Sequence, residues 1–208
     1  MAGLFISFEG IDGCGKSTQA RRLAARLEED GYATLLTREP GGSAGAEDIR
    51  RLVLEGATDR WSAEVETLLF TAARRDHLDR TIRPALEAGT TVITDRFADS
   101  TRVYQGATRG DLRGYVDALH DLCIQVEPDM TFVLDIDPQV GLKRAFDRAG
   151  SELRFEQFGL QMQHDMRQGF LDLAAAAPER FHVIDASGSI DDIFDQIWGA
   201  LSARLRQR

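Results

Sequence analysis

The sequence predicts an α/β fold in which helices cover both faces of a five-stranded parallel sheet. Short apolar segments alternate with helical patterns along the whole chain, and strands that alternate with helices favour parallel pairing. A chain of 208 residues can bury one sizeable core but is too short for two comfortable domains. We therefore expect residues 1–208 to form one domain. The expected strands span residues 4–8, 33–37, 91–94, 130–134 and 182–184.

Apolar residues at helical spacing identify the helices between these strands. Asp137 followed by Pro138 is typical of a helix start, because Asp can cap the helix and Pro fits its first turn. Ser189, with Asp192 three residues later, indicates the start of the last helix. The other patterns are Ala20, Leu23, Ala24 and Leu27; Ile49, Leu52 and Val53; Val65, Leu68, Leu69 and Ala72; and Leu112, Tyr115, Val116, Leu119 and Leu122.

The most informative motif is the segment 10–17, Gly-Ile-Asp-Gly-Cys-Gly-Lys-Ser, between the first expected strand and the first expected helix. It fits the phosphate-loop pattern of Gly, four residues, and Gly-Lys-Ser/Thr. Glycines let backbone N–H groups turn towards a phosphate, and the helix N-terminus adds partial positive charge. Lys16 is expected to reach the terminal phosphates and Ser17 to ligate Mg²⁺. The strand–loop–helix context disfavours the alternative, a glycine-rich turn that merely caps a helix.

Charged residues follow two other expected strands, at the edge of the sheet where ligands of parallel α/β folds bind. Asp95 and Arg96 follow the third strand. An acid there can hold Mg²⁺ through water or orient an acceptor, and the arginine adds a fixed positive charge. Arg38 follows the second strand, and a Pro-Gly-Gly turn at 40–42 would pre-position its guanidinium for phosphate oxygens. A surface acid and base and a solvated loop arginine are the alternatives.

Phe70 and Arg74 lie four residues apart and therefore share one face of a helix. An aromatic ring beside a guanidinium can stack on a nucleobase and hydrogen-bond it. A phenylalanine next to Leu69 is more often a core residue, so both interpretations stay open.

A basic, glycine-containing segment lies between the fourth and fifth expected strands. It holds Lys143, Arg144, Arg148 and Arg154. Such a segment can form a lid, expected at about 148–156, whose arginines close on a transferring phosphoryl group and exclude water. A helix with a solvated basic face explains the same residues equally well.

Composition narrows the partners and the compartment. The formal net charge of −9 argues against a nucleic-acid-binding surface. No segment approaches the length of a membrane span, and no secretory signal stands at the N-terminus. Cys14 and Cys123 lie far apart, without metal-ligand spacing, which suits a reducing cytosol. We therefore expect a cytoplasmic protein that binds neither nucleic acid nor membranes, and we assign no role to its four histidines.

Four blocks of the sequence resemble thymidylate kinases in order and spacing. The blocks at 37–42 and 95–100 together are far more specific than a phosphate loop alone, and the resemblance covers essentially the whole chain. It implies a P-loop nucleotide-kinase fold with a short lid. It also implies transfer of the γ-phosphoryl of ATP to dTMP, giving dTDP, with Mg²⁺. The blocks are 8–18 (Phe-Glu-Gly-Ile-Asp-Gly-Cys-Gly-Lys-Ser-Thr), 37–42 (Thr-Arg-Glu-Pro-Gly-Gly), 95–100 (Asp-Arg-Phe-Ala-Asp-Ser) and 104–106 (Tyr-Gln-Gly).

The resemblance also implies which residues act on each substrate. The implied ATP site is Gly10, Ile11, Asp12, Gly13, Cys14, Gly15, Lys16, Ser17 and Thr18. The implied dTMP site is Asp12, Arg38, Phe70, Arg74, Arg96, Ser100, Tyr104 and Gln105. The implied catalytic residues are Lys16, Asp95, Arg96, Arg148 and Arg154, and the implied metal ligands are Ser17 and Asp95.

Within the implied dTMP site, each part of the nucleotide has its own contacts. By resemblance, Phe70 stacks on the thymine, and Arg74 hydrogen-bonds it with help from Ser100 and Gln105. Tyr104 crowds the sugar 2′ position and so favours deoxyribose, while Asp12 contacts the 3′-hydroxyl. Arg38 and Arg96 grip the acceptor phosphate, and Asp95 supports the metal and acceptor region.

The lid and the assembly also follow from the resemblance. Gly13 in the loop, with Arg148 and Arg154 in the lid, resembles the bacterial type, in which the lid supplies cationic charge that the loop does not. The family is usually a homodimer.

Two other functions remain as alternatives. One is another P-loop kinase that acts on a nucleoside or on a different monophosphate; paired grips at Arg38 and Arg96 favour a phosphorylated acceptor over a nucleoside. The other is a P-loop switch protein. GTPase switches usually carry an Asn-Lys-x-Asp motif, and the sequence has none.

Overall fold

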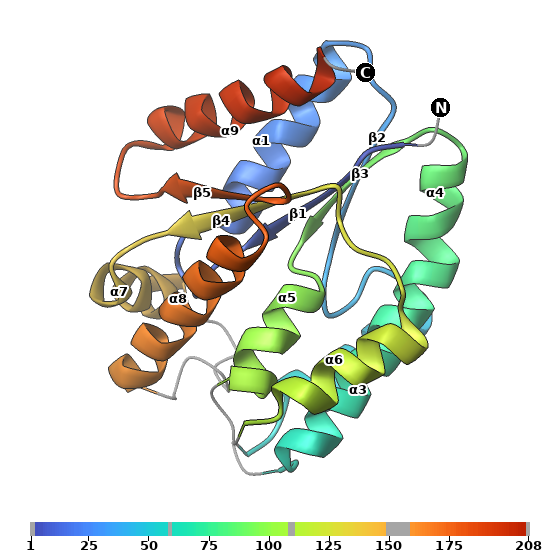
Figure 1. Ribbon diagram of the computed structural model, residues 1–208, viewed down its shortest axis with the longest axis vertical. Coiled ribbons are helices and arrows are strands. Elements are labelled where there is room, and N and C mark those ends of the chain that lie inside the picture. Colours follow the sequence, from blue (N-terminus) through green and yellow to red (C-terminus); the bar gives the residue numbers. More distant parts are fainter. Residues whose placement is uncertain (1–2, 58–59, 108–110, 149–158, 207–208) are drawn as a thin grey trace.

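The computed structural model describes residues 3–57, 60–107, 111–148 and 159–206, with only the backbone described at 107 and 146–148. Its strands form one parallel sheet in the order β2-β3-β1-β4-β5 (Figure 1). The predicted five-stranded parallel sheet is confirmed, and every strand begins and ends within one residue of its expected position. The strands are β1 Phe5–Glu9, β2 Thr34–Arg38, β3 Thr91–Asp95, β4 Met130–Asp135 and β5 Phe181–Asp185.

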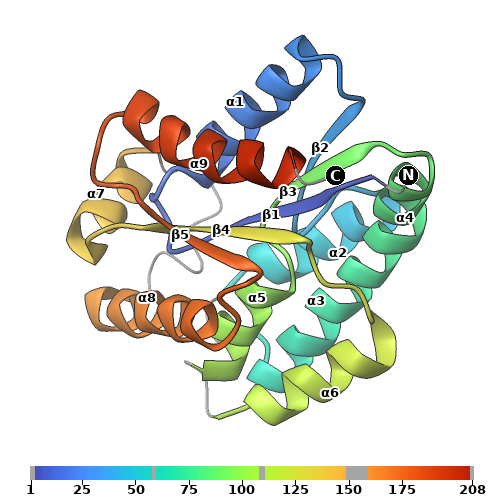
Figure 2. The ribbon, with the colours of Figure 1, turned by 45° about the horizontal axis from the view of Figure 1, so that its top comes forward.

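Helices cover both faces of the sheet, with α1 and α9 on one face and α3, α4, α5, α6 and α8 on the other (Figure 2). The α-helices are α1 Lys16–Glu29, α2 Ala44–Leu54, α3 Ala63–His77, α4 Arg83–Glu87, α5 Ala98–Thr101, α6 Arg113–Cys123, α7 Pro138–Arg148, α8 Gly159–Ala176 and α9 Ile190–Leu205. Two π-helical turns, η1 Leu78–Ile82 and η2 Arg102–Ala107, continue α3 and α5.

The predicted helix starts are confirmed at two positions. Ser189 and Asp192 form a reciprocal capping box at the start of α9. At the start of α7, the Asp137 carboxylate accepts hydrogen bonds from the backbone N–H groups of Gln139 at 2.8 Å and Val140 at 3.4 Å. These caps satisfy backbone donors that a helix start leaves without partners.

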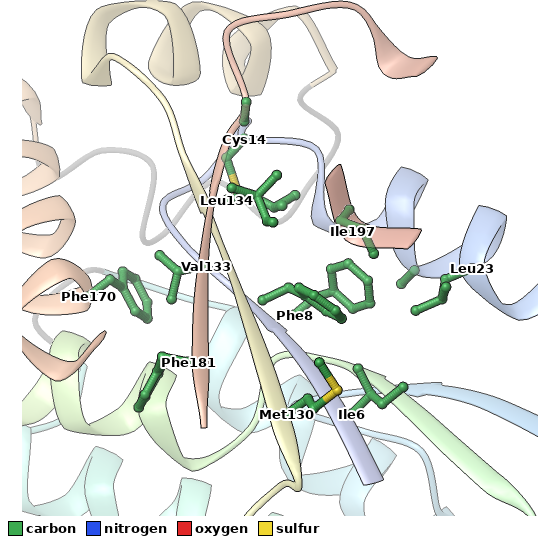
Figure 3. Close-up of a cluster of buried hydrophobic side chains, with 14 of the residues drawn as sticks. Ile6, Phe8, Cys14, Leu23, Met130, Val133, Leu134, Phe170, Phe181 and Ile197 are labelled. Carbon is green, nitrogen blue, oxygen red and sulfur yellow. The ribbon is translucent and has the colours of Figure 1, made fainter. Parts of the chain in front are cut away.

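The main core lies between the central strands and the helices on either side of them (Figure 3). Phe8 on β1 packs in one cluster with Leu23 of α1 and Ile197 of α9, and Val133 of β4 lies nearer to Phe170 of α8. β1 is buried along its whole length because it pairs with both β3 and β4, whereas the edge strands β2 and β5 are partly exposed. This layout explains why the central strands read as continuous apolar runs.

The register of the sheet brings the segments that carry the expected site residues to one edge. Phe8 and Arg38 both pair with Asp95 across neighbouring strands, so β1, β2 and β3 end side by side. The loop after β1 and the residues after β3 therefore meet at the carboxyl edge, where parallel α/β sheets bind ligands. Within the described residues, no helix is both long and apolar enough to cross a membrane.

Candidate active site

The loop from Gly10 to Gly15 links the end of β1 to the first turn of α1. Gly13 has a φ of 78°, and a Cβ there would overlap with the carbonyl oxygen of Gly141 on α7. Only glycine fits such a backbone without strain or collision. The loop is thus locked against the start of α7, and the absence of a side chain at Gly13 follows from packing.

Lys16 folds back over the loop that precedes it. Its Nζ donates to the backbone oxygens of Gly10 at 3.0 Å and Ile11 at 2.8 Å, and the residue is only 6% exposed. The backbone N–H groups of Thr18 and Gln19 donate to the Gly15 oxygen, which begins the helical ladder of α1. The ammonium and the helix N-terminus therefore gather positive charge at one end of the loop.

The two expected metal ligands lie against each other. The Ser17 hydroxyl on α1 donates a hydrogen bond to the Asp95 carboxylate at the end of β3. A hydroxyl and a carboxylate fit Mg²⁺, which takes oxygen ligands and usually completes its shell with phosphates and water. The structure thus brings together a donor set that suits the ion.

Arg96 lies at the centre of a polar cluster beside the loop. Its backbone has a φ of 73°, and its Nη2 donates to Asp12 at 2.5 Å while Nη1 donates to Ser100 at 3.2 Å. Its guanidinium carbon lies 5.1 Å from the ring centre of Tyr104, whose hydroxyl donates to Asp12 at 3.0 Å. Three other expected dTMP-site residues, Asp12, Ser100 and Tyr104, therefore each contact Arg96.

Electrostatics keep this cluster in a fixed charge state. Burial lowers the pKa of Arg96, but Tyr104, Asp12, Asp95 and Glu9 together raise it well above its usual value. Burial raises the pKa of the Tyr104 hydroxyl well above its usual value, although Arg96 opposes the shift. Arg96 therefore stays cationic and Tyr104 stays neutral over the physiological pH range.

Glu9 is a site residue whose role no sequence motif predicts. The carboxylate is fully buried at the end of β1 and accepts hydrogen bonds from the Phe97 backbone N–H at 2.7 Å and the Ser100 hydroxyl at 2.6 Å. Burial and the nearby Asp99 raise its pKa to about 7, against opposing effects of Ser100, Arg96 and the Phe97 N–H. Its position could have indicated a role, because Glu9 is an acidic residue at the end of an apolar strand and directly precedes the phosphate loop.

Arg74 is held rigidly on α3. Its Nε donates to Glu39 at 2.7 Å, and its Nη2 donates to the Phe97 backbone oxygen and to the Thr101 hydroxyl, each at 3.1 Å. Glu39 also contacts Nδ1 of His77 at 3.1 Å, and both residues are buried. His77, to which the sequence assigned no role, therefore has a structural one: it helps to hold Glu39 against Arg74.

Phe70 lies on the same helix as Arg74, and Gln105 contacts that helix at Glu66. Phe70 is partly exposed and precedes Arg74 by one helical turn on α3. Gln105 on η2 is buried, and its Nε2 lies 3.4 Å from the Glu66 carboxylate, which is also on α3. The sequence did not predict roles for Glu66, Glu39 and His77. Each of them contacts a site residue, or a residue that supports one, that is distant in the sequence.

Arg38 stands apart from these clusters, and two further expected residues fall outside what the structure describes. Arg38 is exposed at the end of β2, and its Nη2 donates to Glu47 of α2 at 3.0 Å. Arg148 ends α7, but its side chain lies outside the described residues, as does all of Arg154 and most of the expected lid at 148–156.

A phosphate loop after the central strand, joined through Ser17 and Asp95 to a second polar cluster, defines a P-loop phosphotransferase. The family model "Thymidylate kinase" matches residues 8–197. The chain belongs to the thymidylate kinase family.

Relatives and solved structures agree with this family. The chain is 67% identical to a thymidylate kinase of Dinoroseobacter shibae, with 89% of each chain covered. It is 64% identical to a thymidylate kinase of Ruegeria pomeroyi, over 92% of this chain and 90% of the relative. A crystal structure of thymidylate kinase from Ehrlichia chaffeensis superposes with a TM-score of 0.80 at 35% identity, over 97% of this chain and 99% of that one.

Proposed function

We propose that this chain transfers the γ-phosphoryl group of ATP to dTMP, giving ADP and dTDP, with Mg²⁺ as the cofactor. A phosphate oxygen of dTMP forms a bond to the γ-phosphorus, and the bond between that phosphorus and the β–γ bridging oxygen breaks. Membership of the thymidylate kinase family supports this reaction. The structural observation that carries it is the contact between Ser17 of the loop and Asp95, with Arg96 next to it in the chain.

The donor side is formed by the loop and the start of α1. Backbone N–H groups of residues 10–18 would surround the phosphates of ATP, and Lys16 would exchange its contacts with Gly10 and Ile11 for the terminal phosphates. Ser17 and Asp95 would hold Mg²⁺, which neutralises charge on the β- and γ-phosphate oxygens when bound.

The acceptor side is formed by the cluster around Arg96. Arg96 would bind the dTMP phosphate as a permanent cation, and Arg38 would join it by giving up its exposed ion pair with Glu47. Asp12 and Tyr104, already joined by a hydrogen bond of 3.0 Å, would contact the deoxyribose. Asp95 would support both the metal and the acceptor.

The base would lie on Phe70, which is partly exposed between its neighbours on α3. Arg74 would donate to a thymine carbonyl, since three protein acceptors already fix its guanidinium. Gln105 and Ser100 would complete the base contacts. These assignments rest on the match between the family motif and the residues that the structure brings together.

The lid and the extent of the domain belong to the same proposal. Residues 1–208 would act as one kinase domain, and the segment at about 148–156 would close over the phosphates with Arg148 and Arg154. Because there is no room for a side chain at Gly13, the loop cannot carry an arginine at this position. Additional positive charge near the γ-phosphate would therefore come from the lid.

We also propose a homodimer in a reducing, cytoplasmic compartment. Helix α3 contacts both α2 and α6, and the three helices are neighbours (Figure 2). Each of them exposes large apolar side chains. Exposed apolar side chains on adjacent helices favour association. Both cysteines, Cys14 and Cys123, are free thiols, which suits a reducing compartment. The exposed apolar residues are Leu52, Val65, Leu68, Tyr115 and Leu122.

A coupled assay with ATP and Mg²⁺ over a panel of nucleosides and nucleoside monophosphates tests the reaction. We expect dTMP to have the highest kcat/KM. A different monophosphate or a nucleoside that ranks above dTMP would instead establish the alternative, another P-loop nucleoside or nucleoside-monophosphate kinase.

A further inference from the structure

Two pairs of polar side chains lie on either side of Phe70, between α3 and the segment α5–η2. Glu66, Phe70 and Arg74 are spaced by four residues and share one face of α3. At one end of this face, Arg74 Nη2 donates to Thr101 at 3.1 Å. At the other end, Gln105 Nε2 lies 3.4 Å from Glu66 Oε2. Phe70 therefore lies between Arg74 and the Glu66–Gln105 pair along this face of α3.

The guanidinium of Arg74 presents only one kind of group to a ligand on Phe70. Its Nε and Nη2 donors are used by Glu39, Phe97 and Thr101, and Nη1 carries the donors that these bonds do not use. Since arginine has no acceptor, its contribution to recognition is fixed by its chemistry.

Gln105 is ambiguous by contrast, because its amide carries an acceptor oxygen and a donor nitrogen of nearly equal shape. The side chain is 1% exposed, so water cannot compensate for a wrong orientation. Whether the amide oxygen or the amide nitrogen of Gln105 faces the ligand depends on the hydrogen-bond partner of the other atom.

Glu66 resolves this ambiguity. Its carboxylate is fully buried, and a carboxylate accepts hydrogen bonds but does not donate them. An amide turned the other way would place the Gln105 oxygen against the Glu66 oxygen, which is repulsive in a buried environment. The amide nitrogen therefore faces Glu66, and the amide oxygen is left for the ligand.

We propose that Glu66 is a positioning residue that orients the Gln105 amide and thereby selects bases with an N3–H donor. The inference rests on the proposed placement of the dTMP base on Phe70. Thymine and uracil carry a donor at N3 and a carbonyl at position 4, which match the Gln105 oxygen and the Arg74 donors. Cytosine carries an acceptor at N3 and an amino group at position 4, so both contacts would be mismatched.

The substitution Glu66→Gln tests this role with little change in volume. A glutamine can donate as well as accept, so the Gln105 amide is no longer held in one orientation. We expect the ratio of kcat/KM for dTMP to that for dCMP to fall about tenfold, which is the order expected for one lost hydrogen-bond preference. The change should appear mainly as a higher KM for dTMP and a lower KM for dCMP, with a smaller change in kcat.

The control variant Glu64→Gln makes the same chemical change at an exposed position on the same helix and should leave the ratio unchanged. Gln105→Met removes the amide and should lower the ratio by itself. Adding Glu66→Gln to Gln105→Met should then have no further effect, because Glu66 acts through Gln105. If Glu66→Gln does not fold, an unchanged ratio in Gln105→Met still overturns the proposal.

The outcomes separate this inference from the proposed function. A wild-type enzyme that prefers an acceptor other than dTMP contradicts the function itself. A wild-type enzyme that prefers dTMP, together with a Glu66→Gln variant that keeps the full ratio or raises both KM values equally, overturns only the role of Glu66.

Discussion

Among single residues, Lys16 is placed so that its ammonium can exchange hydrogen bonds within the loop for hydrogen bonds to a ligand. It donates to the carbonyl oxygens of Gly10 and Ile11, two acceptors of the loop itself. Anionic phosphate oxygens are stronger acceptors for an ammonium than neutral carbonyls are. The same side chain can therefore close the loop without ligand and hold the phosphates of ATP with it.

Lys16→Ala is expected to lower kcat by roughly 100-fold or more, because a charge that acts on the transferring phosphoryl group is removed. The fold should remain, since Lys16 is not part of the hydrophobic core. A steady-state assay measures kcat, and calorimetry with dTMP provides the control, because acceptor binding should be retained. Near-normal turnover would remove Lys16 from the catalytic residues.

Glu9 gives the site a predictable response to pH. Its pKa is raised to about 7 in the folded chain, against an ordinary value of about 4.5. The folded state therefore holds a proton that the unfolded state has released between these two pH values. Stability from this residue is present below about pH 4.5 and is lost as the pH rises through about 7.

Glu9→Gln removes this titration. We expect the free energy of unfolding of the wild type, minus that of Glu9→Gln, to decrease by up to about 3 kcal/mol as the pH rises through that window. Denaturant unfolding at several pH values between 4 and 8 measures the difference. A difference that does not change with pH would show that Glu9 titrates at its ordinary value.

The sequence predicts a site residue well when the residue belongs to a contiguous motif, and poorly when its role depends on a partner far away in the chain. Lys16 and Ser17 stand in one contiguous motif, so their types and spacing are sufficient. Glu39 supports Arg74, which is 35 residues away, and its burial depends on packing between separate elements. No local pattern encodes such a pairing. The spacing of Glu66 four residues before Phe70 was readable, but its contact with the distant η2 was not.

At the scale of elements, the loop and α7 fit together only because Gly13 lacks a side chain. Gly13→Ala would combine a positive φ with an overlap between the new Cβ and the Gly141 oxygen. We expect it to lower the free energy of unfolding by about 1–2 kcal/mol more than a positive φ alone costs, with weaker ATP binding. Thermal unfolding and calorimetry measure the two effects.

Gly31→Ala is the matched control, because Gly31 has a φ of 86° and no heavy atom within 4 Å of a new Cβ. It should show the cost of the backbone conformation alone and should bind ATP normally. Equal destabilisation by both substitutions would contradict the tight fit of loop and α7.

The proposed lid makes a separate kinetic prediction. An arginine that stabilises only the transition state affects kcat more than substrate binding. Arg154→Ala is therefore expected to lower kcat by a larger factor than it raises the KM for ATP. Steady-state kinetics separate the two parameters, and an unchanged kcat would leave Arg148 as the lid arginine to test.

The elements themselves were largely predictable. All five strands are found within one residue of their expected bounds, because each contains a short apolar segment bounded by polar residues or by a helical pattern. The order β2-β3-β1-β4-β5 was not predicted, since it depends on pairing between strands far apart in sequence. The π-helical turns η1 and η2 also lack a local signal, since they continue helices whose apolar spacing is ordinary.

For the whole molecule, the proposed homodimer would bury the exposed apolar side chains of α2, α3 and α6. Leu68 on α3 is 47% exposed. Leu68→Glu should shift the mass measured by light scattering from twice 23.1 kDa towards 23.1 kDa. Ile190→Glu, at an exposed position on the start of α9, is the control and should leave the mass unchanged. A wild type that is monomeric at micromolar concentration would contradict the dimer.

In the proposed enzyme, the loop after β1 binds ATP and the cluster around Arg96 binds dTMP, in two sites that face each other. Calorimetry with dTMP, in magnesium buffer and with a non-hydrolysable ATP analogue already bound, measures whether the two sites are separate. We predict that one dTMP binds per chain and that the analogue is not displaced. Failure of either nucleotide to bind, or competition between them for one site, would contradict the account.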